Sequence, residues 1–153
     1  MSKIVNNIYK IHNNPFVFTP LIIEFFKFSQ SKPKDILLAY LILPLVLYET
    51  SRKSLVFART TSSLITFSKK KENFFGLPER VAQYKDITNQ CIQYAIDNKI
   101  IQINNELTVE ILIDNSNTMK NLKQELIASS KLHKIFKDFD VVAIYKLLGV
   151  KEL

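Results

Sequence analysis

The longest apolar stretch of the chain runs from residue 36 to residue 48 and carries no charged side chain. A helix built from it is apolar on every side, so the pattern predicts a helix at the centre of the hydrophobic core. Asp35 can cap the start of this helix, and Pro44 is expected to kink or split it. The charged residues 50–53 are expected to end it. The stretch is shorter than the roughly 20 residues of a membrane span, so a buried helix is preferred to an interfacial membrane segment.

A second apolar stripe lies ahead of this stretch. Residues 13–16 are typical of a turn, and Thr19 with Pro20 can form the cap and the first position of a helix. The large side chains that follow predict a buried helix face. Its members are Leu21, Ile22, Phe25, Phe26 and Phe28.

The pattern after residue 60 predicts four more helices. Short helices are expected at residues 61–70 and 141–148, the second stopped by the glycine that follows it. Longer helices are expected from Pro78 to about residue 98, with a candidate break near Asp86, and at residues 118–136. Together with the first two, these segments make helix the dominant secondary structure.

Two short β-like runs, at residues 100–103 and 107–113, flank a plausible turn at residues 104–106 and predict a hairpin. The predicted fold class is therefore mainly α with one small β-hairpin (α+β). A helix followed directly by a hairpin is also the order of a winged helix. In that interpretation residues 88–98 are the recognition helix and residues 100–113 the wing, so a winged-helix-like core is one candidate.

Composition supports one domain covering residues 1–153. The chain has no repeat, low-complexity tract or evident linker, and 47% of its residues are hydrophobic, enough for a core without disulfides or metals. A single cysteine, Cys91, excludes an intramolecular disulfide and fits a reducing compartment. Because no secretory signal is visible either, we expect a cytoplasmic protein without a membrane association.

The net charge of +7 is unevenly distributed. Residues 1–77 contain eleven Lys or Arg and four Asp or Glu, whereas residues 78–153 contain ten of each. A basic half indicates an acidic partner, either nucleic acid or an acidic protein surface, although solubility alone could also explain it. The candidate contacts are Arg52, Lys53, Arg59, Lys69, Lys70 and Lys71.

The residues that usually carry catalysis are sparse. The two glycines of the chain lie far apart, which excludes a glycine-rich phosphate loop. His12 and His133 are distant in sequence and do not form a zinc-binding pattern with Cys91, which falls on an apolar helix face. We therefore expect no catalytic residue, no metal site and no cofactor, and a chain that is not an enzyme.

The presumed winged-helix region is poorly suited to reading DNA. Residues 78–113 contain three basic and five acidic side chains, a net charge of −2, so little there could neutralise phosphates. A protein partner fits this region better. Aromatic residues near the ends of predicted elements are candidate anchors for such a partner, with ordinary core packing as the alternative. They are Phe16, Phe57, Phe74 and Phe75.

Short motifs occur in a characteristic order and together span nearly the whole chain. They are Asn13, Asn14, Pro15 and Phe16; residues 41–48 followed by Thr50 and Arg52; Thr61, Ser62, Ser63 and Leu64; Glu79 and Arg80; and residues 144–150. In these motifs the chain resembles the small middle component of three-component ABC systems, the bacterial defence operons that include Lamassu.

This resemblance implies a non-catalytic adaptor in an anti-phage or anti-plasmid complex. The partners implied are an SMC-like ABC ATPase and a nuclease effector from the same operon, with DNA contacted through the complex. The alternative is a stand-alone winged-helix DNA-binding regulator.

Overall fold

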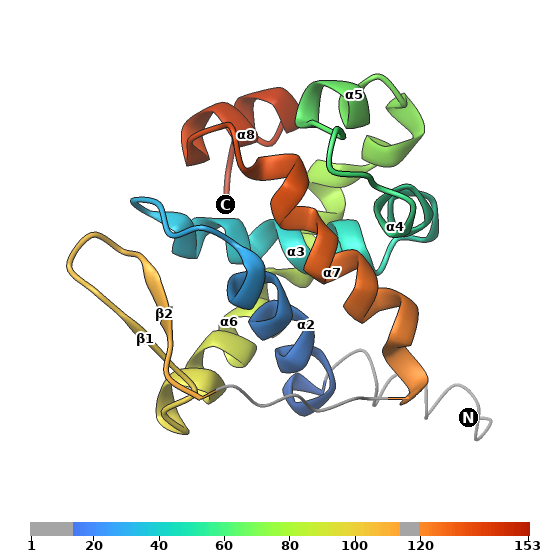
Figure 1. Cartoon of the computed structure of the whole chain (residues 1–153). Coiled ribbons are helices and arrows are strands. Elements are labelled where there is room, and N and C mark those ends of the chain that lie inside the picture. The colour runs from blue at the N-terminus through green and yellow to red at the C-terminus, as the bar shows by residue number, and fades with distance from the viewer. Residues whose placement is uncertain (1–13, 114–119) are drawn as a thin grey trace.

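The computed structural model describes residues 14–113 and 120–153, and this part of the chain contains seven α-helices and one two-stranded antiparallel hairpin (Figure 1). The predicted fold class, mainly α with one small hairpin, is confirmed. The α-helices are α2 (Pro15–Phe28), α3 (Ala39–Val46), α4 (Glu49–Val56), α5 (Leu64–Ser68), α6 (Leu77–Asp97), α7 (Lys123–Phe136) and α8 (Val141–Leu148). The strands are β1 (Ile101–Ile103) and β2 (Val109–Ile111), and three 3-10 turns are η1 (Asp35–Leu38), η2 (Lys71–Phe74) and η3 (Lys120–Leu122).

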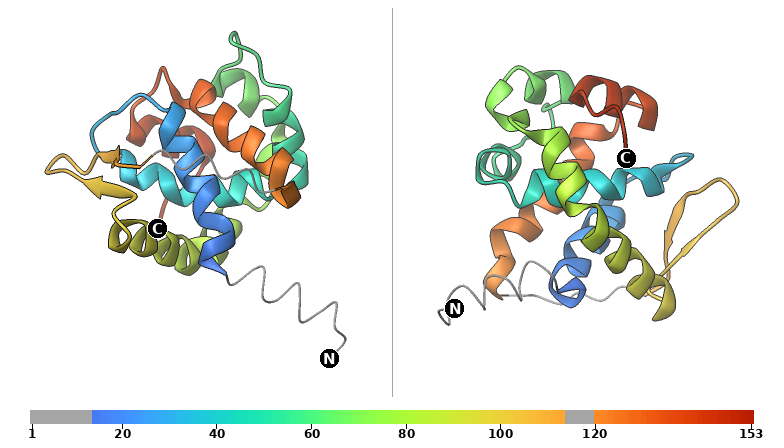
Figure 2. Two further views of the ribbon diagram at one scale, coloured as in Figure 1. Left: turned by 60° about the horizontal axis from the view of Figure 1, so that its bottom comes forward. Right: turned by 180° about the vertical axis from the view of Figure 1, so that it is seen from behind.

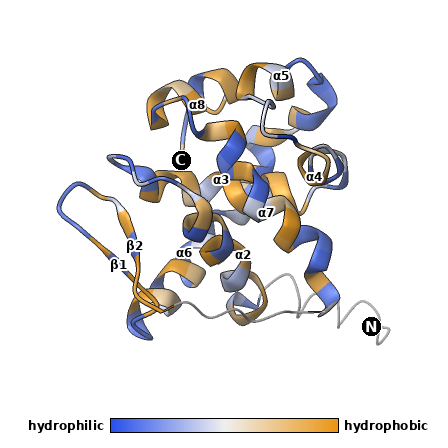
Figure 3. Cartoon of the chain, in the orientation of Figure 1, coloured by the Kyte–Doolittle hydropathy of each residue, from blue (hydrophilic) through white to orange (hydrophobic). Residues whose placement is uncertain are grey.

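Helix α3 lies at the centre of the hydrophobic core, as the apolar stretch predicted. Helices α2, α4, α6 and α7 all pack against it, and its side chains from Leu41 to Val46 are buried. Figure 3 shows that hydrophobic residues recur along the helices that surround α3. Burial on every side removes the apolar surface of α3 from water and makes this helix the main hydrophobic contact of the chain.

The ends of this central segment differ from the prediction. Of the kink or split expected at Pro44, the split does not occur, because α3 continues through Pro44 to Val46. A proline removes only one backbone donor to the preceding turn. Residues 50–53 do not end the helix with a charged loop but belong to α4. There Glu49 and Lys53 form an ion pair of 2.8 Å at the i, i+4 spacing that supports a helix.

Helix α2 begins one turn earlier than Thr19 and Pro20 predicted. Asn14 is the N-cap, with its Oδ1 accepting a hydrogen bond of 3.0 Å from the Phe16 N–H, and Pro15 occupies the first turn. The Thr19 hydroxyl instead donates to the Pro15 carbonyl at 2.6 Å. Asn14 is the preferred cap because its side chain accepts from the otherwise free Phe16 N–H. Pro15 has no N–H of its own and therefore suits the first position of the helix.

Asp35 was predicted to cap the central helix but performs a different task. Its buried carboxylate accepts hydrogen bonds from the backbone N–H of Val109 at 2.8 Å and of Lys32 at 3.3 Å. Burial raises the pKa of this carboxyl, and the two N–H donors oppose that rise. Asp35 therefore attaches the hairpin to the start of η1 instead of capping a helix.

The side chain of Lys32 connects the same junction to the end of α7. Its Nζ donates to the carbonyl oxygens of Phe136 at 2.9 Å and Phe139 at 2.7 Å. Phe136 is the last residue of α7 and Phe139 lies just beyond it, at the helix end where a cation is favoured by the helix dipole. Burial lowers the pKa of Lys32, while nearby carboxylates raise it.

Helix α6 is a single helix of 21 residues, so the candidate break near Asp86 is wrong. No proline or glycine follows Pro78 within it, and its buried residues continue from Leu77 to Ala95. The hairpin follows after a short turn and stands to one side of the helices (Figure 2). Its register pairs Ile101 with Ile111 and Ile103 with Val109.

The turn of the hairpin is longer than residues 104–106. Asn104 Oδ1 accepts from the N–H groups of Glu106 at 2.9 Å and Thr108 at 3.0 Å, and Leu107 has a positive φ of 61°. A left-handed residue cannot extend a strand, so β2 starts at Val109 and not at residue 107.

The C-terminal helices agree with the prediction. η3 and α7 cover the predicted helix 118–136, of which residues 118 and 119 lie outside the described part. α8 ends at Gly149, whose positive φ of 72° suits a residue without a Cβ. The Asp140 side chain caps its other end by accepting from the Ala143 N–H at 2.7 Å.

Replacing Leu41 by alanine should lower the free energy of unfolding by about 2–5 kcal/mol, because the site is fully buried and a cavity remains. Urea denaturation followed by circular dichroism measures the change. Gln90→Ala, at an exposed position of α6, is the control and should stay within about 0.5 kcal/mol of the unmodified chain. Equal stability of Leu41→Ala and the control would contradict the central position of α3.

Asp35→Ala should destabilise the chain by about 1–3 kcal/mol, because the buried N–H of Val109 loses its acceptor. Hydrogen exchange locates the effect: the amides of the hairpin should exchange faster, whereas those at the centre of α3 change only with global stability. Asp140→Ala, which removes an exposed cap of α8, is the comparison. Unchanged exchange in the hairpin would show that Asp35 does not hold it.

Candidate interaction surface

A pocket of about 320 Å³ opens where α4, α5 and η2 meet α7. We call it the Phe57 pocket. Phe57, Ala58, Phe67 and Ile135 supply apolar lining, and Lys53 and Lys70 supply two cations. The pocket therefore combines an apolar wall with positive charge, a combination suited to a ligand that is both apolar and acidic.

Buried Asn73 holds three of the elements around this pocket together. Its Oδ1 accepts from the Ser54 hydroxyl of α4 at 3.0 Å, and its Nδ2 donates to the Phe67 carbonyl of α5 at 3.1 Å. The ring of Phe74 packs edge-on against Phe67, with centroids 5.3 Å apart. Because these groups are satisfied within the protein, the pocket wall is formed before any ligand arrives.

Helix α7 is attached to α4 by two polar contacts. Lys131 Nζ donates to the Val56 carbonyl near the end of α4. Arg52 Nη1 donates to the Leu47 carbonyl at 3.2 Å and lies 3.6 Å from Glu125 Oε1. These contacts place Ile135 of α7 beside the pocket.

The predicted basic contacts divide into three groups. Lys53 and Lys70 line the Phe57 pocket, whereas Arg52 is half-buried and bonded internally. Arg59, Lys69 and Lys71 are exposed: Arg59 lies in the connection to α5, Lys69 follows that helix, and Lys71 begins η2. The structure thus brings two of the six predicted basic residues together in one site and gives Arg52 a structural position.

The predicted aromatic anchors also differ in their surroundings. Phe57 and Phe75 are 79% and 78% exposed, and Phe16 is 62% exposed. Phe16 lies in the first turn of α2 with its ring 4.8 Å from that of Tyr94. Phe74 is half-buried against the core. Only Phe57 of the four lies in the pocket lining.

Arg80 is the polar residue whose importance the sequence pattern did not reveal. Its Nε donates to the Pro44 carbonyl at 3.1 Å and its Nη2 to the Asn73 carbonyl at 3.3 Å, while Nη1 contacts the Phe75 carbonyl. The guanidinium also lies 3.8 Å above the Tyr48 ring, a cation–π contact. Burial lowers the pKa of Arg80. The sequence offered one signal for this role. The apolar central stretch has no polar side chain that could donate a hydrogen bond to the last backbone carbonyls of its own helix, so a donor must come from elsewhere.

Two groups that could perform chemistry, Cys91 and His133, lie in different surroundings. Cys91 is buried, which raises the pKa of its thiol to about 11, so it is protonated at neutral pH. His133 stacks on Phe28 with ring centroids 5.9 Å apart, and desolvation lowers its pKa. His12 lies outside the described residues. Residues 14–113 and 120–153 contain no group of three or more His, Cys, Asp or Glu side chains that could hold a metal.

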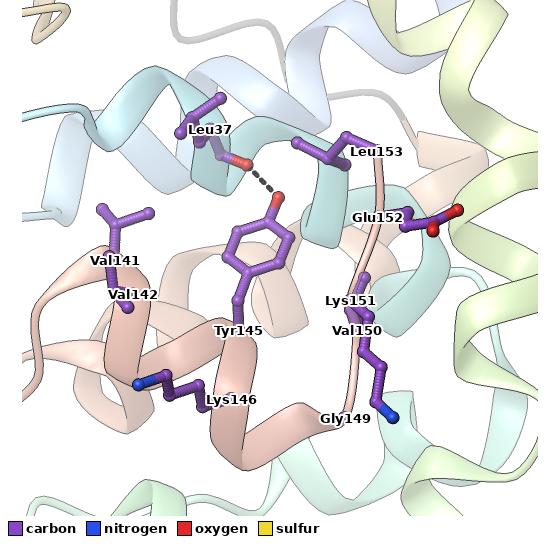
Figure 4. A pocket seen from close by; sticks show the side chains of 10 residues that line it. All are labelled: Leu37, Val141, Val142, Tyr145, Lys146, Gly149, Val150, Lys151, Glu152 and Leu153. Atoms are coloured by element: carbon purple, nitrogen blue, oxygen red, sulfur yellow. Dashed lines mark hydrogen bonds between the residues drawn. The ribbon is translucent and has the colours of Figure 1, made fainter.

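A second pocket, of about 540 Å³, lies between α8, η1 and the C-terminal residues (Figure 4). The hydroxyl of Tyr145 points across it and donates to the Leu37 carbonyl. Val141, Val142 and Leu153 make its lining mostly apolar.

None of the helices within residues 14–113 and 120–153 combines the length and the hydrophobicity that a membrane-spanning helix needs.

The fold is that of a small, mainly helical protein, and the Phe57 pocket is formed by its own helices. Residues 2–152 match the family described as ABC-three component (ABC-3C) system Middle Component 3, and the chain belongs to this family. The resemblance to a middle component of such a system is thereby confirmed. No curated protein and no solved structure matches the chain.

Most of the motifs that carried the resemblance have structural tasks. Asn14 caps α2, residues 41–48 include most of α3, and Ser63 caps α5 by accepting from the Thr66 N–H at 3.2 Å. Arg80 donates to the Pro44 carbonyl near the end of α3, and Gly149 terminates α8. The motifs therefore specify the architecture of the family member.

Arg80→Lys should lower the free energy of unfolding by about 1–3 kcal/mol, because a lysine cannot donate to three carbonyls and cover the Tyr48 ring together. Arg59→Lys, at an exposed arginine, makes the same exchange without those contacts and should be neutral. Chemical denaturation of both variants checks the prediction. Similar stability of the two variants would show that the Arg80 contacts contribute little.

Proposed function

We propose that this chain is a non-catalytic adaptor of a Lamassu-type bacterial defence complex directed against phages or plasmids. In it the chain, acting as one domain, bridges an SMC-like ABC ATPase and a nuclease effector from the same operon in the cytoplasm. The observation that carries the proposal is family membership as a middle component. Membership of a three-component system implies that the partners of this chain belong to the same system.

The exposed aromatic rings support an adaptor. Large aromatic side chains are enriched among the residues that dominate protein interfaces. Phe16 lies in the first turn of α2, whereas Phe57 follows α4 and Phe75 follows η2. Exposed rings at different elements give an adaptor more than one candidate anchor for its two partners. A stable interface buries about 800 Å² on each side, so each ring would be an anchor within a larger contact.

The alternative is a stand-alone winged-helix DNA-binding regulator, for which the order of α6 and the hairpin is the supporting observation. The internal contacts of Arg80 weigh against it. Residues 78–113 contain only three basic side chains, and Arg80 uses its guanidinium on carbonyls of the protein. Lys85 and Lys99 then remain to neutralise phosphates, fewer than a specific DNA reader normally uses. We therefore propose that the ATPase and the effector make the contacts with DNA.

Co-expression with the neighbouring genes should give one complex containing this chain, the ATPase and the effector. Size-exclusion chromatography with light scattering measures its mass, and omission of this chain should separate ATPase from effector. The isolated chain should show no nuclease or ATPase turnover with divalent metals.

Two outcomes would contradict the proposal. In the first, this chain elutes alone although the ATPase and effector are present and folded. In the second, the isolated chain binds a specific DNA sequence with nanomolar affinity at physiological salt, which would support the regulator instead.

A further inference from the structure

We infer that the Phe57 pocket binds an acidic segment of another component of the same ABC-three component system. One apolar side chain of that segment inserts beside Phe57. A carboxylate of the segment pairs with Lys70, and a second one takes the place of Glu49 as the partner of Lys53. The inference rests on the proposed function and adds to it the site and the chemistry of the partner.

The shape of the pocket fits a side chain. It has a volume of about 320 Å³, and Ala58, Phe67 and Ile135 form part of its lining. The ring of Phe57 stands at its edge with 79% of the residue exposed. Covering such a ring removes apolar surface from water, at roughly 25 cal/mol for each Å². An inserted aliphatic or aromatic side chain would bury the ring and the pocket wall together.

The charge around the pocket selects an acidic partner. Lys53 and Lys70 are among the lining residues, and no Asp or Glu is found in that lining. Lys69 and Lys71 are exposed next to Lys70 and extend the positive surface. Complementary charges at the rim of an interface accelerate association and select against wrong partners.

Two carboxylates near the pocket favour a polypeptide over a nucleic acid. Glu49 lies 2.8 Å from Lys53 Nζ, and this contact lowers the pKa of Glu49. Glu72 is exposed next to Lys71. A nucleic-acid backbone carries a negative charge at every nucleotide and would meet these carboxylates. A peptide can place its few acidic residues on the lysines and its apolar residue in the pocket.

The pocket is also preformed, which reduces the ordering cost of binding. Asn73 connects α4, α5 and η2 through bonds of 3.0 and 3.1 Å, and Lys131 of α7 donates to Val56 of α4. A partner segment therefore meets a wall whose backbone is already held in place.

The test measures the affinity of the purified ATPase and effector for the full chain and its variants by isothermal titration calorimetry. For the component that binds here, Phe57→Ala and the double change Lys53→Glu with Lys70→Glu should each weaken binding by at least about tenfold. The matched control is Lys146→Glu with Lys151→Glu, which reverses two lysines of the second pocket and should change the affinity less than about twofold. Thermal denaturation confirms that every variant is folded.

Treatment of the wild-type complex with a carbodiimide, a zero-length crosslinker, should join Lys53 or Lys70 to an Asp or Glu of that component. If neither component binds the wild-type chain, both the inference and the proposed function fail. If a component binds but the pocket variants bind it as tightly as the wild type, only the inference fails. If a 20-nucleotide single-stranded DNA loses binding to the pocket variants while both components keep theirs, the site is a nucleic-acid site and the inference is overturned.

Discussion

The burial of α3 on every side is the constraint from which the rest of the structure follows. A helix leaves its last carbonyl groups without internal partners, and an apolar segment in the core has neither water nor its own side chains to satisfy them. Here Arg80 donates to the Pro44 carbonyl at 3.1 Å, Ser51 to that of Leu45, and Arg52 to that of Leu47 at 3.2 Å. An unsatisfied buried carbonyl costs about 1–3 kcal/mol, so α4 and α6 are held where these side chains reach.

The same polar side chains connect the core to the candidate interaction surface. Arg52 lies 3.6 Å from Glu125 of α7, and Arg80 also donates to the Asn73 carbonyl of η2. Asn73 in turn connects α4 and α5 beside the Phe57 pocket. Both arginines are thus used inside the protein. The positive charge presented around the pocket comes from lysines and Arg59, whose side chains are not needed to close helix ends.

The proposed adaptor role requires a chain that is rigid enough to hold partners in place and still offers surfaces to them. The junction of Lys32 and Asp35 contributes to the first requirement, because it joins the hairpin to η1 and to the end of α7 through buried and part-buried hydrogen bonds. Exposed Phe57 and its neighbouring lysines contribute to the second. Few glycines, two in all, also limit backbone freedom. These features agree with the proposed adaptor role.

The sequence by itself determined the helical class, the buried central stretch, the hairpin after α6 and the end of α8 at Gly149, because each depends on local periodicity or on a residue with a special backbone preference. Only the tertiary structure decided the tasks of Asp35 and Arg80 and the grouping of Lys53, Phe57 and Lys70 in one pocket. Asp35 bonds to Val109, 74 positions away, and Arg80 to Pro44, 36 positions away. A hydrogen-bond partner that distant is chosen by how the helices pack, and no local pattern of residues records that choice.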